Sequence, residues 1–571
     1  MIGGKQMKFS EFTYERPDVN KIKEEMEVLL TAFNAAEVVE EQVSAIEKIN
    51  KLRNDVSTQF NICYVRHSVD TLDEFYQQEQ DYIDEISPEI EGLETRYYEA
   101  LVQSKFKDVL EEKWGKQLFA LADAQLKVFS DEVVTLLQQE NKLSTEYTKL
   151  MASAKIIFDG EERTLAQMEP FAESKDRAVR KEANEKKFAF LAENEEQLDR
   201  IYDDMVKVRT EIAKKLGYSN FVELAYYRMY RTDYNAEMVA KFRDQVKEHI
   251  VPLATKLKER QKSRIGVNAL KYYDEPFNFI SGNAAPKGDA DWIIENGQKM
   301  YSELSKETGE FFSYLNEDGL MDLVAKKGKA GGGYCTFIEN YKAPFIFSNF
   351  NGTSGDIDVL THEAGHAFQV YSSGANFDIP EYYWPTYEAA EIHSMSMEFF
   401  TWPWMELFFQ EDVDKYKFSH LSSSLLFLPY GVSVDEFQHW VYENPEATPQ
   451  ERKQAWRKIE QKYMPHKDYD GNDYLENGGF WQRQSHIYTS PFYYIDYTLA
   501  QICAFQFWKR SREDQKEAWA DYVQLCQLGG SLPFTELVKK ANLLSPFEDG
   551  CVESVIGEID AWLNSVDDSK L

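Results

Sequence analysis

Two histidines four residues apart, His362 and His366, carry the clearest chemistry in this sequence of 571 residues. On a helix they lie on one face, one turn apart, so both imidazoles can bind one Zn²⁺ at about 2.0–2.1 Å. Glu363, beside the first histidine, can reach a metal-bound water and act as a general base. Ser354 or Asp356 can cap the start of this helix. The spacing predicts a zinc-binding helix, although a helix surface can also show His-Glu-x-x-His by chance.

A zinc enzyme needs a third protein ligand and an open position for water. The segment from Trp384 to Trp404 offers candidates, and its prolines, Pro385 and Pro403, suit the two ends of one buried helix. Three glutamates fall close to one stripe of that helix: Glu388, Glu391 and Glu398. Carboxylates on an apolar helix are costly to bury unless a positive charge lies beneath them. This favours a metal over a solvated acidic face.

The motif HEAGH, followed by a glutamate 25 residues past its second histidine in an E-x-x-x-x-x-x-E helix, resembles the thimet oligopeptidase and oligoendopeptidase F family of zinc peptidases, peptidase family M3. The resemblance covers roughly residues 328–508 well, and the helical N-terminal half only in character. It implies one Zn²⁺ per chain, held by His362, His366 and Glu391, with Glu363 as the base. It also implies that Glu398 supports a ligand histidine from behind. We expect Glu388 in the same supporting position.

The segment from Ser485 to Trp508 is unusually dense in tyrosine. Hydroxyl groups there can donate hydrogen bonds to the oxyanion that forms when water attacks a peptide carbonyl, typically worth ~2.7–4 kcal/mol per donor. In the resembling family, a histidine followed by a tyrosine-rich run plays this part. His486 and Tyr497 match it best as catalytic residues. Together with Tyr494, on the same helical face as Tyr497, they are also the predicted substrate-binding residues.

The match to the tyrosine-rich run is imperfect. Pro491-Phe492 replaces the glycine-tyrosine pattern of the thimet branch, so Tyr488 or Tyr493 can serve instead of the tyrosines named above. An aromatic core stripe is the other interpretation, which applies strongly to Phe505. The departure leaves the individual tyrosine roles open, but not their collective one.

The fold is predicted to be mostly α-helical. From Asp18 to about Leu270 the chain is poor in Gly and Pro, and apolar residues recur at spacings of three and four. A further helix is expected from Asp289 to Thr308. The resemblance implies a two-lobed, zincin-like peptidase with a deep cleft. We expect residues 1–200 to form an N-terminal helical lobe, one wall of the cleft, and residues 201–571 to form the catalytic region.

Two β-like runs, Tyr334–Ile338 and Pro344–Phe350, follow the glycine cluster Gly328–Gly333 and predict a small antiparallel sheet immediately before the zinc helix. An exposed strand edge can pair with an extended peptide without recognising its side chains. A phosphate-binding loop is the alternative for the glycines. It is disfavoured, because no Lys-Ser/Thr pair and helix follow them.

Charge and cysteine usage restrict the partners and the compartment. The formal net charge is −34 and the pI is near 4.8, which disfavours binding to nucleic acid or to an anionic membrane. The five cysteines are few and widely spaced, which favours a reducing compartment without disulfides. The N-terminus lacks an apolar targeting segment, so we expect a cytoplasmic protein. Met7 is a candidate natural start, with Met1 to Gln6 as an upstream extension.

These features predict a zinc-dependent metalloendopeptidase that hydrolyses internal bonds of short, unstructured oligopeptides through a zinc-activated water. One alternative is a zinc carboxypeptidase or dipeptidyl carboxypeptidase, since another all-helical family pairs the motif with a distal glutamate. Another is a peptide-binding protein with a decayed site. A purely structural scaffold would leave the buried carboxylates of the Glu391 helix unexplained. The sequence carries no signal for the oligomeric state.

Overall fold

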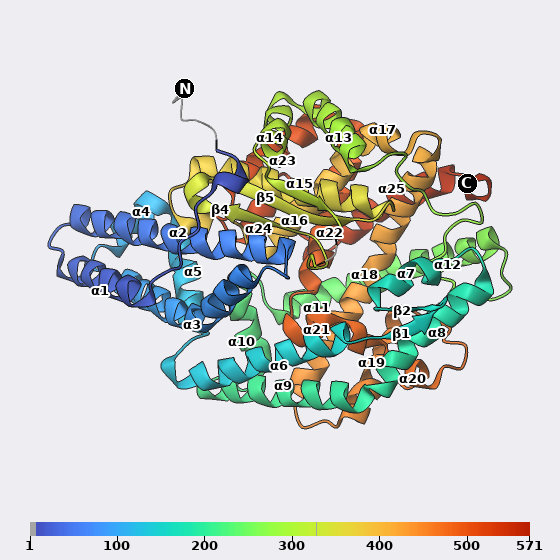
Figure 1. Ribbon diagram of the computed structural model, residues 1–571, viewed down its shortest axis with the longest axis horizontal. Coiled ribbons are helices and arrows are strands. Elements are labelled where there is room, and N and C mark those ends of the chain that lie inside the picture. Colours follow the sequence, from blue (N-terminus) through green and yellow to red (C-terminus); the bar gives the residue numbers. More distant parts are fainter. Residues whose placement is uncertain (1–6, 327) are drawn as a thin grey trace.

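The chain folds into packed helices with two small β-sheets (Figure 1). This computed structural model describes residues 7–326 and 328–571, and the candidate extension Met1 to Gln6 lies outside that part. The mostly helical fold class expected from the sequence is confirmed. Among the described residues, no helix combines the length and the apolar character needed to cross a lipid bilayer.

The first five helices pack together at one end of the molecule (blue in Figure 1). They are α1 (Val19–Ala35), α2 (Val39–Val69), α3 (Glu74–Val102), α4 (Lys107–Trp114) and α5 (Lys116–Leu126). Asp18 and Asp73 begin α1 and α3, because each carboxylate accepts hydrogen bonds from backbone N–H groups of the first turn. Ile46 and Tyr97 are fully buried between these helices, and Tyr382 packs into the same core. The second half of the chain therefore helps to hold this bundle.

A second group of helices continues the chain and enters the main core. They are α6 (Val134–Ala152), α7 (Glu169–Ala172), α8 (Arg177–Glu193), α9 (Glu195–Lys215), α10 (Phe221–Arg228), α11 (Ala236–Gln245) and α12 (Val251–Ile265). A hairpin of β1 (Ile156–Phe158) and β2 (Glu161–Arg163) precedes α7. The boundary expected between residues 200 and 201 falls inside α9. Ile201, Met205 and Ile212 of that helix are fully buried in the same core as the later helices.

The larger sheet has three strands in the order β3-β5-β4: β3 (Met321–Val324), β4 (Tyr334–Ile338) and β5 (Ala343–Phe350). β4 and β5 pair antiparallel, as the sequence predicts, but β3 pairs parallel to β5. The expected antiparallel pair is therefore present, and a parallel strand that the sequence did not indicate extends it. β3 has only four residues and a weak burial pattern, so no alternation revealed it. β4 is an edge strand, and at its C-terminal end the carbonyl of Phe337 accepts a hydrogen bond from Asn61 of α2.

The helix expected from Asp289 to Thr308 is two helices, α13 (Ala290–Leu304) and α14 (Lys306–Glu317). Ser305 separates them in an extended conformation, and its side chain accepts a hydrogen bond from the N–H of Thr308. Asp289 caps α13 in the same way. A capping serine thus ends one helix and begins the next.

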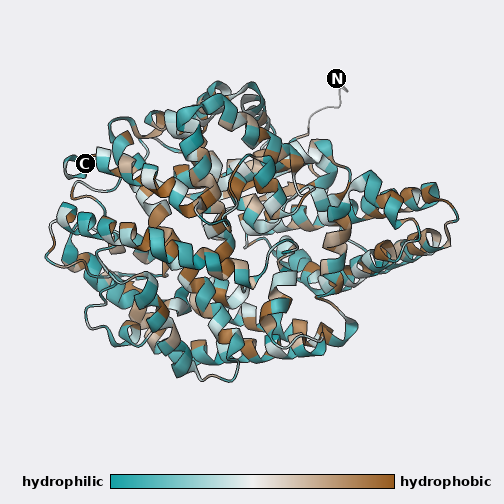
Figure 2. Cartoon of the chain, turned by 180° about the vertical axis from the view of Figure 1, so that it is seen from behind, coloured by the Kyte–Doolittle hydropathy of each residue, from teal (hydrophilic) through white to brown (hydrophobic). Residues whose placement is uncertain are grey.

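The remaining helices follow the sheet and form the centre of the molecule. They are α15 (Gly355–Asn376), α16 (Tyr387–Phe400), α17 (Glu406–Phe409), α18 (Val413–Glu443), α19 (Pro449–Tyr463), α20 (Asp473–Glu476), α21 (Ser485–Thr489), α22 (Ile495–Glu513), α23 (Gln515–Leu528), α24 (Phe534–Lys540) and α25 (Cys551–Ser565). Figure 2 shows apolar residues gathered in the central helices and hydrophilic residues on the outer ones.

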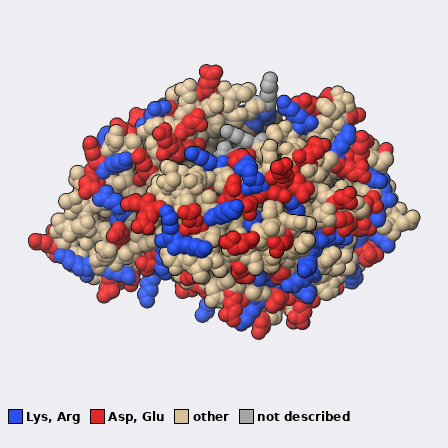
Figure 3. Space-filling view, turned by 90° about the horizontal axis from the view of Figure 1, so that it is seen from below, with Lys and Arg blue, Asp and Glu red and all other residues tan. Residues whose placement is uncertain are grey.

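Acidic side chains are spread over the face of the molecule seen in Figure 3. This agrees with the composition of the chain, which has 98 acidic and 64 basic residues.

Candidate metal centre and catalytic site

Both motif histidines lie on α15. No side chain caps the N-terminus of this helix, which follows a loop held by hydrogen bonds. Ser354 occupies the cap position, but its side chain makes no capping hydrogen bond. The carboxylate of Asp356 instead accepts hydrogen bonds from the N–H groups of Asn351 and Gly352 before the helix, at 2.9 and 2.8 Å. Asp356 therefore does not cap the first turn of α15 but stabilises the loop that precedes it.

The predicted Glu391 helix is shorter than its prolines suggest. α16 begins at Tyr387, two residues after Pro385, and ends at Phe400, before a 3₁₀ turn over Trp402–Trp404. It is buried along almost its whole length. It crosses α15 closely at Gly365, where an added Cβ would lie 2.5 Å from the carbonyl oxygen of His393.

The three predicted metal ligands lie together. Oε2 of Glu391 is 3.2 Å from Nε2 of His362 and 3.5 Å from Nε2 of His366. One ligand atom from each residue lies within 4.8 Å of the others. Two ligands of a tetrahedral zinc at about 2.0–2.1 Å would be roughly 3.3 Å apart. The donor set and its spacing therefore fit a zinc ion.

Charge and unpartnered atoms at this site agree with that fit. Burial alone would raise the pKa of the Glu391 carboxyl, but His366 and His362 outweigh it and hold this pKa well below its usual range. Burial raises the pKa of Glu363, whose side chain is almost fully enclosed. Among the described residues, Oε2 of Glu363 has no hydrogen-bond partner. A buried carboxylate oxygen without a donor is costly, so this atom is suited to a water or a substrate proton.

The two glutamates expected behind the ligands have different surroundings. Oε2 of Glu398 lies 3.1 Å from Nδ1 of His362, the arrangement that would orient this imidazole. The structure does not bring Glu388 to the ligands. It accepts hydrogen bonds from Thr386 and from Tyr234 instead. Burial, followed by the charge of Asp496, raises the pKa of Glu388 to about 8.

The catalytic pair expected on the tyrosine-rich segment also lies at this site. The hydroxyl of Tyr497 is 3.4 Å from Nε2 of His486. The amide of Gln484 contacts Nδ1 of His486 at 2.9 Å, while Oε1 of Gln484 accepts a hydrogen bond from Tyr430. Because Tyr430 takes the amide oxygen, the NH₂ group faces the imidazole, so Nδ1 accepts and Nε2 carries the proton. Nothing in the sequence distinguished Gln484 for this role.

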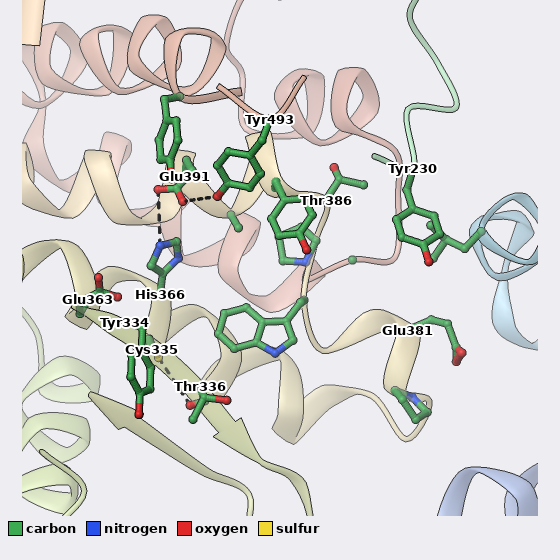
Figure 4. A pocket seen from close by; sticks show the side chains of 18 of the residues that line it. Tyr230, Tyr334, Cys335, Thr336, Glu363, His366, Glu381, Thr386, Glu391 and Tyr493 are labelled. Atoms are coloured by element: carbon green, nitrogen blue, oxygen red, sulfur yellow. Dashed lines mark hydrogen bonds and ion pairs between the residues drawn. The ribbon is translucent and has the colours of Figure 1, made fainter. Parts of the chain in front are cut away.

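The other three tyrosines of this segment, Tyr488, Tyr493 and Tyr494, have different contacts. Tyr493 donates to Oε1 of Glu391 at 3.1 Å, a contact the sequence left open (Figure 4). The ring of Tyr494 lies against His486, with centroids 5.1 Å apart. Tyr488 faces the core instead: its hydroxyl donates to the carbonyl of Leu198. Ser394, one turn after Glu391, also donates to Oε2 of that carboxylate at 2.8 Å, which its spacing could have suggested.

The candidate metal ligands lie where two cavities meet. A cavity of about 750 Å³ is lined by β4, by the ligands and by residues of the N-terminal bundle, such as Arg53 and Tyr98. Figure 4 shows His366, Glu391 and Glu363 on one side of it and Tyr230 and Glu381 on the other. A second cavity, of about 1260 Å³, shares His362 and Tyr497 with the first. Of the three candidate ligands, His362 lines both cavities.

Two family models and a curated relative match most of the chain. The model of the peptidase M3 N-terminal domain matches residues 9–129, and that of peptidase family M3 matches residues 171–280 and 300–555. An oligoendopeptidase F homolog of Borreliella burgdorferi is 24% identical over 452 residues, which cover 73% of this chain and 74% of the relative.

Two solved structures are more similar. A structure of PZ peptidase A with an inhibitor is 71% identical to this chain, covers 98% of it and 100% of its own chain, and superimposes with a TM-score of 0.95. A structure provisionally named oligoendopeptidase F is 66% identical, with 99% and 100% coverage and a TM-score of 0.95.

Proposed function

We propose a catalytic assignment for this chain, which belongs to peptidase family M3 and is therefore a metallopeptidase that cleaves oligopeptides. In this assignment His362, His366 and Glu391 hold one zinc ion, and Glu363 is the general base. The observation that carries it is the single carboxylate oxygen of Glu391 facing both motif imidazoles, at 3.2 and 3.5 Å.

The chain's own groups have distinct tasks in hydrolysis. A zinc ion at this position would supply a Lewis acid, which polarises the substrate carbonyl and lowers the pKa of a bound water. Glu363 takes a proton from the attacking water and returns it to the leaving amine. His486, which carries its proton on Nε2, and Tyr497 donate hydrogen bonds to the oxyanion that forms on the substrate carbonyl.

Substrate binding is proposed along β4, with Tyr494, Tyr497 and His486 on the opposite side. Tyr334, Cys335 and Thr336 of this edge strand line the first cavity beside Glu363. An extended peptide can add to the strand through main-chain hydrogen bonds. The first cavity, of about 750 Å³, and the second, which shares His362 and Tyr497 with it, offer room for several substrate residues, which supports cleavage of oligopeptides at internal bonds.

The cytoplasm remains our proposed compartment. All five cysteines are free thiols, and four of them are buried. Disulfide bonds are typical of oxidising compartments, so this usage favours a reducing one.

The decisive experiment compares Glu363→Gln with His366→Ala and the wild type. We expect E363Q to retain one zinc per chain but to lose hydrolysis of an internally quenched peptide with an amidated C-terminus. H366A should lose the zinc as well. Glu310→Gln, an exposed change on α14, is the matched control and should behave as the wild type. Near-normal turnover by E363Q would contradict the assignment of the base, and full zinc content in H366A would contradict the ligand set.

A further inference from the structure

The carboxylate of Glu398 is held by two histidines, one on each oxygen. Oε2 lies 3.1 Å from Nδ1 of His362, and Oε1 lies 3.2 Å from Nε2 of His420. His420 belongs to α18 and is buried, with its ring stacked on Tyr416 at a centroid distance of 5.4 Å. The candidate metal site is thus connected through one carboxylate to a third helix.

Trp402 determines which nitrogen of His420 carries the proton. Its indole N–H donates to Nδ1 of His420 over 2.9 Å, and an indole nitrogen can only donate. Nδ1 must therefore accept, and the single proton of the neutral ring lies on Nε2, facing Glu398. If the ring of His420 were doubly protonated, its Nδ1–H would face the indole N–H of Trp402 at 2.9 Å, which is repulsive. Trp402 and His420 are both buried, and His420 faces the second cavity on the side of Glu398.

We propose that Trp402 and His420 are positioning residues that prepare His362 for metal binding. His420 donates to Oε1 of Glu398, which orients this carboxylate and stabilises its ionised form, and an ionised carboxylate accepts on both oxygens. His362 must then donate from Nδ1, which leaves the lone pair of its Nε2 free on the side of Glu391. If Glu398 donated to Nδ1 instead, the proton of His362 would lie on Nε2 and block the metal. This inference rests on the proposed zinc ligands.

A second cation is the competing explanation for this cluster. Asp358, Glu398 and His420 each place one possible ligand atom within 4.8 Å of the others. Binding to Nε2 of His420 would need a lone pair on that nitrogen. The hydrogen bond from Trp402 places the ring proton there. Asp358 is already bonded to the hydroxyl of Tyr416. The cluster is better explained as support for His362 than as a metal site.

The test is zinc affinity, measured by competition with a chelator on the purified full-length chain at fixed pH. Trp402→Phe removes the donor to His420, and Trp404→Phe is its matched control in the same 3₁₀ turn, where the indole of Trp404 donates to Glu303. His420→Leu removes the donor to Glu398, whereas His420→Gln retains an N–H group for it. We expect zinc binding to weaken about 10-fold or more in W402F and H420L. W404F and H420Q should stay within about threefold of the wild type.

Two results would overturn the inference. Wild-type zinc affinity in W402F would show that the indole proton does not matter. Equal losses in H420Q and H420L would show that the ring acts by packing, not by donation. The two His420 variants also decide the question if W402F fails to fold. Failure of the proposed function is distinguishable, because it would appear in the wild type, as an absence of zinc binding or as zinc binding unaffected by H366A.

Discussion

The hydroxyl of Tyr493 donates a hydrogen bond to Oε1 of Glu391, while Oε2 of the same carboxylate faces the two motif imidazoles. The two oxygens of Glu391 therefore have separate tasks. One faces the proposed metal position, and the other is fixed by a side chain from the tyrosine-rich segment. We therefore expect Tyr493 to support the proposed metal ligand rather than to donate to the substrate.

Tyr493→Phe should therefore weaken zinc binding. Without the hydroxyl, Oε1 of Glu391 loses its donor and the carboxylate is held less firmly, by Ser394 on Oε2, so we expect an affinity loss of about 10-fold. Chelator competition measures it. Tyr371→Phe, on α15 itself, is the matched control, because its exposed side chain makes ring contacts with Phe311 and Tyr314 and lies on no proposed ligand. A Y493F chain that binds zinc as tightly as Y371F would refute this role.

Tyr497→Phe should instead lower turnover and leave zinc content unchanged. Its hydroxyl lies 3.4 Å from Nε2 of His486 rather than on a metal ligand. Removing one oxyanion donor typically costs about 10²–10³ in kcat. Steady-state kinetics on the quenched peptide, with zinc measured on the same samples, would check it. Loss of metal, or a change in KM alone, would mean that Tyr497 has another role.

The sequence predicted the parts of the site that lie within single helices. The spacing of four residues between His362 and His366 was enough to identify this pair within one helix. Glu391 and Glu398 lie two turns apart on another helix, and their expected roles came from the resemblance to peptidase family M3. Glu388 was misplaced, because the side-chain direction at its helical position depends on how α16 packs. In the structure it faces Tyr234 and Thr386.

Contacts made through the tertiary structure could not be predicted. Trp402 and His420 meet across two helices, and no spacing relates them. Tyr488 and Tyr493 belong to one aromatic run, but the chain turns at Phe492, where φ is 67°, and sends them to different neighbours. β3 was missed because parallel pairing leaves no hairpin signal in the sequence.

Gly365→Ala should separate α15 from α16. An added Cβ would lie 2.5 Å from the carbonyl oxygen of His393 and 2.8 Å from Cα of Ser394, both backbone atoms that cannot step aside. We expect a loss of about 1–3 kcal/mol in the free energy of unfolding. Weaker zinc binding should accompany it, because Glu391 would move away from His362 and His366. Denaturant unfolding and chelator competition measure the two effects.

Gly557→Ala is the control for this change. Gly557 is an exposed helical glycine on α25, and an added Cβ there would meet no atom within 4 Å. Alanine is about 1 kcal/mol more favourable than glycine in a helix, so G557A should be neutral or slightly stabilising. Equal stability and zinc affinity in the two variants would show that the helix crossing tolerates a methyl group.

The last prediction concerns acid stability and the buried carboxylate of Glu140 on α6. Its Oε2 accepts hydrogen bonds from Arg209 at 2.6 Å and Arg228 at 3.1 Å, and Arg209 also donates to the carbonyl of Tyr488. Burial alone would raise the pKa of Glu140, but Arg228 and Arg209 outweigh it and lower this pKa to about 2. The ion pair thus joins the N-terminal half to the tyrosine-rich segment.

Because the folded pKa lies below the unfolded value of about 4.3, the stabilisation is fully present above about pH 5 and is lost as the pH falls towards 2. At pH 7 we expect Glu140→Gln to cost on the order of 3 kcal/mol in the free energy of unfolding. Urea unfolding measures the difference in the free energy of unfolding between wild type and E140Q. This difference should become steadily smaller from pH 5 to pH 3. The control is Glu146→Gln. Glu146 is an exposed residue of α6, the helix that also carries Glu140, and it pairs with Arg200 of α9. Its replacement should cost about 0–1 kcal/mol in the free energy of unfolding. A gap for E140Q that stays constant over this range would show that Glu140 does not titrate with folding.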